Sequence, residues 1–320
     1  MRNARPSRWW VAAFFLIVAP LAAWQDDGSR LAYTEYAWGK YGNGRHALYT
    51  IDLLDGDRRL LTMQERPIEG IDWAPSGDRI LYPDAWGDSL SLWSVEPDGM
   101  DLDWYTRFQI WDDSYPSWAP DSSKIAFMSN KPGNDDICIL DVLRMDRSAA
   151  MDAPENAPIN ITHTPIDERY PAWSPADDVI AFMSDRSGAF QVHLMDADGL
   201  NLEQLTYARD FPNGVTKPPM AWSPDGETLA FSARVDEQVD VYAARRSDGA
   251  ITQLTRDAAH DWSPTYSPDG SRMAFLSGAS DAAQIWVMAP DGSERERITN
   301  RRRARFHIVD WSPALPPGPR

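Results

Sequence analysis

The charged residues best placed to bind a ligand recur at one position of a repeated pattern. This position lies five residues before a tripeptide Trp-(Ser/Ala)-Pro, or its equivalent Tyr-Ser-Pro, and its six copies hold Ile68, Asp113, Glu168, Lys217, Asp261 and Phe306. The next residue along the chain adds Glu69, Arg169 and His307. Carboxylates grouped with a lysine and an arginine can hold a cation or the terminus of a basic peptide. The alternative is that these charges only solvate the surface.

Motifs of known catalytic or metal sites are weak in this sequence. The five histidines occupy non-equivalent repeat positions, although His163, His260 and His307 each fall between a closing strand and the next first strand. Gly87-Asp-Ser-Leu90 matches the nucleophile block of a class of esterases, but that class needs a parallel α/β sheet to present its serine. We therefore expect no catalytic, cofactor-binding or metal-binding residues, and at most weak calcium binding in a channel.

The tripeptide recurs at intervals that indicate the fold. Its aromatic residues are spaced 44 to 55 residues apart and are Trp73, Trp118, Trp173, Trp222, Tyr266 and Trp311. A period of about 40–50 residues is typical of propellers and of helical arrays. Turns such as Pro224-Asp-Gly226 and apolar runs such as Ile180-Ala-Phe-Met183 follow the tripeptides, and no window carries a helical stripe. Each repeat is therefore predicted to be a four-stranded β-meander, one blade of an all-β propeller.

The two ends of the repeat region complement each other. Residues 31–62 supply three strands of a blade that lacks a first strand, and residues 306–313 supply a first strand that nothing follows. Joining them closes the ring and leaves no free sheet edge. The sequence thus predicts a six-bladed β-propeller over residues 29–313, closed by a C-terminal strand.

These repeats also carry a family resemblance. The strings Trp222-Ser-Pro-Asp-Gly226, Leu229-Ala-Phe-Ser and Leu254-Thr resemble the WD-like repeat of the TolB propeller, and the likeness extends over all six units. The resemblance implies a six-bladed propeller outside the cytoplasm that binds other proteins at its mouth and performs no catalysis. The α/β domain that precedes the propeller in TolB has no counterpart in this sequence.

Composition and the two chain ends indicate the cellular location of the protein and limit the classes of partner it can bind. Arg2, Arg5 and Arg8 precede an uncharged apolar run, so residues 1–24 are predicted to be an export signal or an N-terminal membrane anchor, and residues 314–320 a flexible tail. The formal charge of −17 argues against nucleic acid as a partner, since phosphate binding needs clustered Lys and Arg. The lone Cys138 excludes an intrachain disulfide. We expect a periplasmic or secreted monomer that meets a membrane only through its N-terminal segment.

Two function classes stay open at this point. The favoured one is a non-enzymatic propeller that binds an envelope protein or peptide, either at the charged ring or through the long loops at 143–159 and 208–219. The other is a propeller hydrolase or lyase with a metal at the channel mouth.

Overall fold

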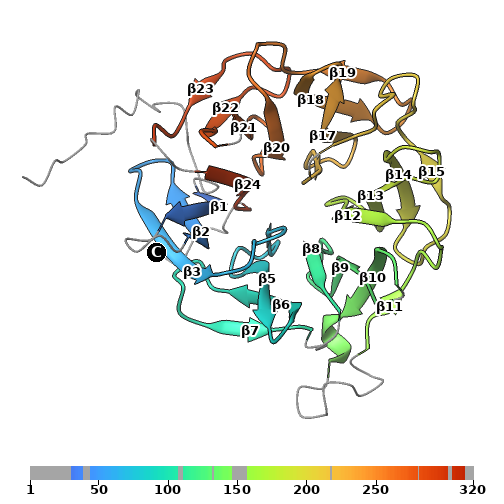
Figure 1. The fold of residues 1–320 in the computed structure, drawn as a ribbon, viewed down its shortest axis with the longest axis horizontal. Coiled ribbons are helices and arrows are strands. Elements are labelled where there is room, and N and C mark those ends of the chain that lie inside the picture. Colours follow the sequence, from blue (N-terminus) through green and yellow to red (C-terminus); the bar gives the residue numbers. More distant parts are fainter. Residues whose placement is uncertain are drawn as a thin grey trace, which may run out of the picture.

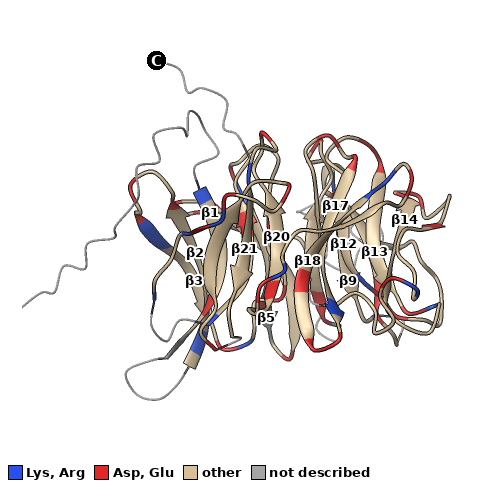
Figure 2. Cartoon of the chain, turned by 90° about the horizontal axis from the view of Figure 1, so that it is seen from above, with Lys and Arg blue, Asp and Glu red and all other residues tan. Residues whose placement is uncertain are grey.

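Six four-stranded antiparallel sheets stand around a central axis in the computed structural model of the chain (Figure 1), and Figure 2 shows this ring edge-on. The structure describes residues 30–38, 44–106, 111–131, 133–145, 157–216, 218–279, 281–301 and 305–313. The architecture is a six-bladed β-propeller, which confirms the predicted fold. The predicted export segment and C-terminal tail lie outside the described residues. Within the described ranges, no helix is long and apolar enough to cross a membrane.

Each blade runs from an inner strand beside the channel to an outer strand at the rim (Figure 1). Blade 1 consists of β24 (Arg305–Trp311), β1 (Arg30–Trp38), β2 (Gly44–Asp52) and β3 (Arg58–Gln64). Blade 2 consists of β4 (Asp72–Trp73), β5 (Ile80–Trp86), β6 (Ser89–Val95) and β7 (Leu102–Trp104). Blade 3 consists of β8 (Asp113–Trp118), β9 (Lys124–Ser129), β10 (Asp136–Asp141) and β11 (Ile159–Asn160), with the short helix η1 (Val142–Arg144) before β11. Blade 4 consists of β12 (Glu168–Trp173), β13 (Val179–Ser184), β14 (Gln191–Asp196) and β15 (Glu203–Gln204). Blade 5 consists of β16 (Ala221–Trp222), β17 (Thr228–Val235), β18 (Gln238–Arg245) and β19 (Ile251–Gln253). Blade 6 consists of β20 (Asp261–Tyr266), β21 (Met273–Ser277), β22 (Gln284–Met288) and β23 (Glu296–Arg297).

Blade 1 is built from both ends of the repeat region. The C-terminal strand β24 pairs antiparallel with β1, in a register that runs from Leu31 opposite Trp311 to Tyr36 opposite Arg305. The Ser312 N–H extends the ladder by donating to the Arg30 carbonyl at 2.9 Å. The predicted closure is therefore confirmed, and it covers an edge of β1 that would otherwise be open to other strands.

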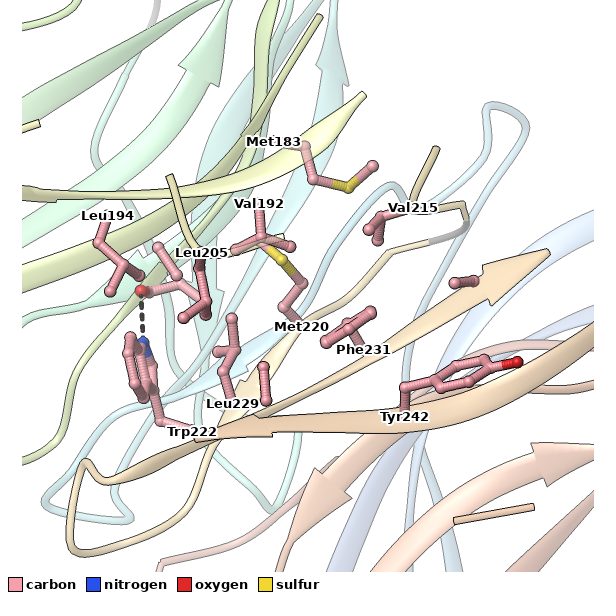
Figure 3. Close-up of a cluster of buried hydrophobic side chains, with 14 of the residues drawn as sticks. Met183, Val192, Leu194, Leu205, Val215, Met220, Trp222, Leu229, Phe231 and Tyr242 are labelled. Carbon is pink, nitrogen blue, oxygen red and sulfur yellow. Dashed lines mark hydrogen bonds between the residues drawn. The ribbon is translucent and has the colours of Figure 1, made fainter. Parts of the chain in front are cut away.

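The core lies between the blades, where apolar faces of neighbouring sheets meet. Figure 3 shows the contact of blades 4 and 5, in which Trp222 packs near Leu194, Leu205 and Leu229. The Trp222 side chain is buried, and its Nε1–H donates to the Ala172 carbonyl of blade 4 at 3.0 Å. The tryptophan of the repeat thus joins each blade to the preceding one by apolar contact, and here also by a hydrogen bond.

The turn after the tripeptide explains its sequence. Asp225 Oδ1 accepts hydrogen bonds from the Ser223 hydroxyl at 2.5 Å and from the Glu227 N–H at 3.0 Å. Gly226 has φ +70° and donates its N–H to the Ser223 carbonyl. A residue with a side chain is strained at this φ, so glycine ends the turn.

The closing Thr of the repeat locks the outer strand onto its neighbour. In blade 4 the Thr206 hydroxyl accepts the Val192 N–H at 2.9 Å and donates to Gln191 Oε1 at 2.8 Å. The same pairing of a threonine hydroxyl with a side chain at or near the start of the third strand recurs at Thr162–Asp136, Thr255–Asp240 and Thr299–Gln284. In these four blades the closing threonine therefore ties the end of the repeat to the third strand by hydrogen bonds.

Candidate functional site

Three of the predicted ring carboxylates begin inner strands at one end of the channel, which we call the start mouth. Asp113, Glu168 and Asp261 are the first residues of β8, β12 and β20. Their exposed fractions are 1%, 0% and 0%. They were expected to ring the channel where a ligand could reach them, but the structure buries them between blades.

Glu168 is held by an ion pair and hydroxyl groups. Its Oε1 lies 2.8 Å from Arg186 Nη2, and both carboxylate oxygens accept from the Thr164 hydroxyl at 2.8–2.9 Å. The Ser184 hydroxyl donates to Oε1 at 3.2 Å. A buried carboxylate with this many donors is satisfied inside the protein, so Glu168 is a structural anion.

The buried carboxylates of Asp113 and Asp261 have fewer hydrogen-bond donors and cations around them than that of Glu168. Burial raises the pKa of Asp113 to about 7, although the Ser129 and Thr106 hydroxyls act to lower it. Burial likewise raises the pKa of Asp261 to about 6, and the closest guanidinium nitrogen, on Arg295, is 3.8 Å away. Both groups therefore exchange their protons close to neutral pH.

Two tyrosines follow Asp113 and Glu168 by two residues on the inner strands β8 and β12. Tyr115 and Tyr170 are partly exposed, and their rings meet edge to face with centroids 4.5 Å apart. Each occupies a β-bulge of its inner strand with positive φ, 49° and 57° respectively. The equivalent positions Gly70 and Ser263 also have positive φ, so this conformation recurs in the repeat, and in blades 3 and 4 the position carries a tyrosine.

Glu69 lies beside this tyrosine pair. Its carbonyl accepts the Tyr115 N–H at 2.8 Å, and its carboxylate influences the pKa of both tyrosines. Burial raises the pKa of Glu69, as do the nearby carboxylates of Asp112 and Asp135. Glu69 forms no ion pair with another described residue, although the Arg66 charge acts to lower its pKa.

Arg169 acts on the same two tyrosines as Glu69, but its guanidinium is already paired with two aspartates. Its Nε lies 2.6 Å from Asp135 Oδ2, and its Nη2 donates to Asp167 Oδ2 at 2.6 Å. The guanidinium also stacks over the Phe190 ring at 5.0 Å. The structure thus brings together two residues of the predicted ring, Glu69 and Arg169, around Tyr115 and Tyr170.

This part of the mouth carries more negative than positive charge. Its described charged residues are Glu69, Asp112, Asp135, Asp167, Arg66 and Arg169. When all are ionised, four carboxylates face two guanidinium groups and leave an excess of two negative charges. We call these residues, together with Tyr115 and Tyr170, the tyrosine mouth.

Two residues of the predicted ring remain, Lys217 and His307. Lys217 is outside the described residues. His307 is exposed on β24 in blade 1, and its ring packs beside His46 rather than beside His163 or His260. Among the described residues, no group of three or more His, Cys, Asp or Glu side chains is arranged to hold a metal ion.

The opposite end of the inner strands holds a feature that the sequence reasoning missed. Asp310 Oδ2 accepts the Trp73 N–H at 3.0 Å, and Asp72 Oδ2 accepts the Trp118 N–H at 2.6 Å. Burial raises the pKa of both, that of Asp310 to about 6, and the Asp310 charge further raises that of Asp72. Both side chains are partly exposed, and both residues belong to inner strands, β4 and β24. The available signal was a polar residue directly before several repeat tryptophans.

Comparisons with known proteins identify the repeats. Residues 209–314 match the family model described as the TolB beta propeller domain. The repeats of residues 209–314 are of the TolB type. A stretch of 92 residues is 36% identical to an uncharacterized protein of Agrobacterium fabrum, covering 29% of this chain and 30% of that protein. A stretch of 121 residues is 31% identical to the Tol-Pal system protein TolB of Anaeromyxobacter dehalogenans, covering 38% of this chain and 26% of that protein. The matched segments therefore span less than a third of these relatives.

Solved structures support the TolB-type fold. TolB from Acinetobacter baumannii superposes with a TM-score of 0.75 and 19% identity, over 90% of this chain and 68% of that one. Oligogalacturonate lyase from Vibrio parahaemolyticus superposes with a TM-score of 0.53 and 16% identity, over 84% of this chain and 79% of that one. At these identities the likeness concerns the fold alone.

The TolB-type propeller also has a cleft away from the start mouth. It measures about 630 Å³ and lies between blades 5 and 6, where the turns at Asp225, Asp269 and Asp291 meet Tyr266. Each of these carboxylates accepts hydrogen bonds within its own turn. These aspartates stabilise turns, and the cleft follows from the repeat geometry.

Proposed function

We propose that this chain is an extracytoplasmic, non-enzymatic binding protein of the cell envelope, which takes a protein or peptide partner at the tyrosine mouth. The TolB-type repeats support the binding role, and the tyrosine mouth supports its location. The observation that carries the location is the edge-to-face pair Tyr115–Tyr170 beside the half-buried carboxylate of Glu69.

The chemistry of the tyrosine mouth favours a cationic group of the partner. A lysine, arginine or amino terminus would be attracted by tyrosine ring faces and by the Glu69 carboxylate. Arg169 is held by two aspartates, so it lines the mouth without neutralising Glu69. We therefore infer that the partner presents a basic residue, flanked by apolar surface that covers the two rings.

An array of synthetic peptides tests the proposal. Peptides of equal length, with lysine and arginine, with only neutral residues, or with aspartate and glutamate, are probed with the purified chain at two salt concentrations. We expect retention by the cationic set, weakened by added salt because partly exposed charges are screened. Equal retention by all three sets would contradict the proposed chemistry.

The cellular location needs its own test. Fractionation of an expressing bacterium should recover the full chain outside the cytoplasm and a chain lacking residues 1–24 inside it. Recovery of both forms in the cytoplasm would contradict the proposed location. Weak calcium binding in the channel stays a prediction, which titration of the purified chain with CaCl₂ tests.

The lyase alternative has no support beyond the fold. The similarity to oligogalacturonate lyase is distant, and the described part of this chain brings no three metal-binding side chains together. We therefore propose no enzymatic activity.

A further inference from the structure

Two histidines meet on the composite blade 1, outside the tyrosine mouth. His46 lies on β2 and His307 on β24, the strands on either side of β1. Their ring centroids are 5.7 Å apart, with ring planes inclined by 46°. Residues separated by most of the chain thus present two imidazoles side by side.

The strand register explains this approach. Tyr36 of β1 is opposite His46 on one side and opposite Arg305 on the other. Between the pairs Glu35–Phe306 and Tyr33–Val309, a bulge sets His307 and Ile308 against the single residue Thr34. The extra residue shifts His307 along the strand, and Tyr36 packs on His46 at 4.9 Å and restricts the orientation of its ring.

The spacing of the two rings fits one shared metal ion. A metal–nitrogen bond of about 2.0–2.1 Å places a ring centroid about 3 Å from the metal, so two imidazoles bound at tetrahedral to linear angles have centroids about 5–6.5 Å apart. The observed 5.7 Å falls in this range, so the two ring positions are compatible with chelation of one ion.

We propose that His46 and His307 bind a transition-metal ion of the Zn²⁺, Ni²⁺ and Cu²⁺ class and thereby clip the C-terminal strand onto the N-terminal blade. Imidazole nitrogen suits these ions, whereas Ca²⁺ and Mg²⁺ require oxygen ligands. Because the two ligands come from opposite ends of the propeller sequence, bound metal would stabilise ring closure.

Titration of the full chain with Ni²⁺ or Zn²⁺ tests the site, using protein purified without a polyhistidine tag. We expect one equivalent of metal to bind and the melting temperature to rise by about 5 °C at a free metal concentration a hundredfold above the Kd, reversibly with EDTA. Binding should weaken at least tenfold in His307→Ala, whose side chain is exposed, and in His46→Ala.

The matched control is His163→Asn. His163 is also exposed, and its φ of 49° is better tolerated by asparagine than by alanine. The His163→Asn variant should bind metal as the unmodified chain does. Equal binding by His307→Ala and the unmodified chain, or no stoichiometric binding by the unmodified chain, would overturn the proposal.

Discussion

Gly70 shows how a single residue supports the tyrosine mouth. It has φ +94°, and a Cβ at this position would lie 2.4 Å from the Tyr115 Cα. Gly70 precedes Trp73 by the same three positions that separate Tyr115 from Trp118 and Tyr170 from Trp173. The absence of a side chain thus lets blade 2 approach the bulge of blade 3.

Gly70→Ala is therefore expected to destabilise the protein by more than about 3 kcal/mol, because backbone strain of about 1–3 kcal/mol is added to a backbone clash. Urea unfolding measures the change. Gly87→Ala is the matched control, since Gly87 has φ +66° but open space around its Cβ position. Equal losses in the two variants would show that the contact with Tyr115 contributes nothing.

The contacts between blades depend on the repeat tryptophans. Trp222→Ala removes a buried indole and its hydrogen bond to Ala172, so we expect a loss of about 3–5 kcal/mol in the free energy of unfolding. Met100→Ala, at a side chain with 79% exposure, should change it by less than about 0.5 kcal/mol. A similarly small effect of Trp222→Ala in urea unfolding would refute the packing role.

Blade order and closure were predictable because they follow from periodicity. The placement of individual side chains was not. Asp113, Glu168 and Asp261 stand at equivalent repeat positions, but their burial depends on groups such as Arg186 and Arg295 that fold over them from other parts of the sequence. Positive φ recurs three residues before the repeat aromatic residue, but residue type did not reveal it, because bulges of this kind accept residues other than glycine, as at Tyr115, Tyr170 and Ser263.

At the scale of the whole molecule, buried carboxylates make stability depend on pH. The pKa values of Asp113, Asp261 and Asp310 are raised to about 7, 6 and 6, above the value of about 3.9 in an unfolded chain. The folded state therefore binds more protons between about pH 4 and pH 7, and stability falls as pH rises through this window.

We expect a higher melting temperature at pH 5 than at pH 8. Asp113→Asn removes one of these ionisations, so it should reduce the difference between the two pH values. A melting temperature that rises from pH 5 to pH 8 would contradict the assignment of raised pKa values to these groups.

Closure of the ring is the second property of the whole molecule. Deleting residues 304–320 removes β24 and exposes the edge of β1, so the truncated chain should aggregate or melt at a much lower temperature. Deleting only residues 314–320 keeps β24 and is the control. Equal melting temperatures of the two truncated chains would contradict a closing role for β24.

The central claim is that the tyrosine mouth binds a cationic group through Glu69. Its most direct test is calorimetric titration of the purified chain with the cationic peptide that the array retains best. We predict that Glu69→Gln, which keeps the shape of the side chain, weakens binding about tenfold, while the control Glu203→Gln on the outer strand β15 leaves the Kd unchanged. Equal affinity of Glu69→Gln and the unmodified chain would contradict the claim.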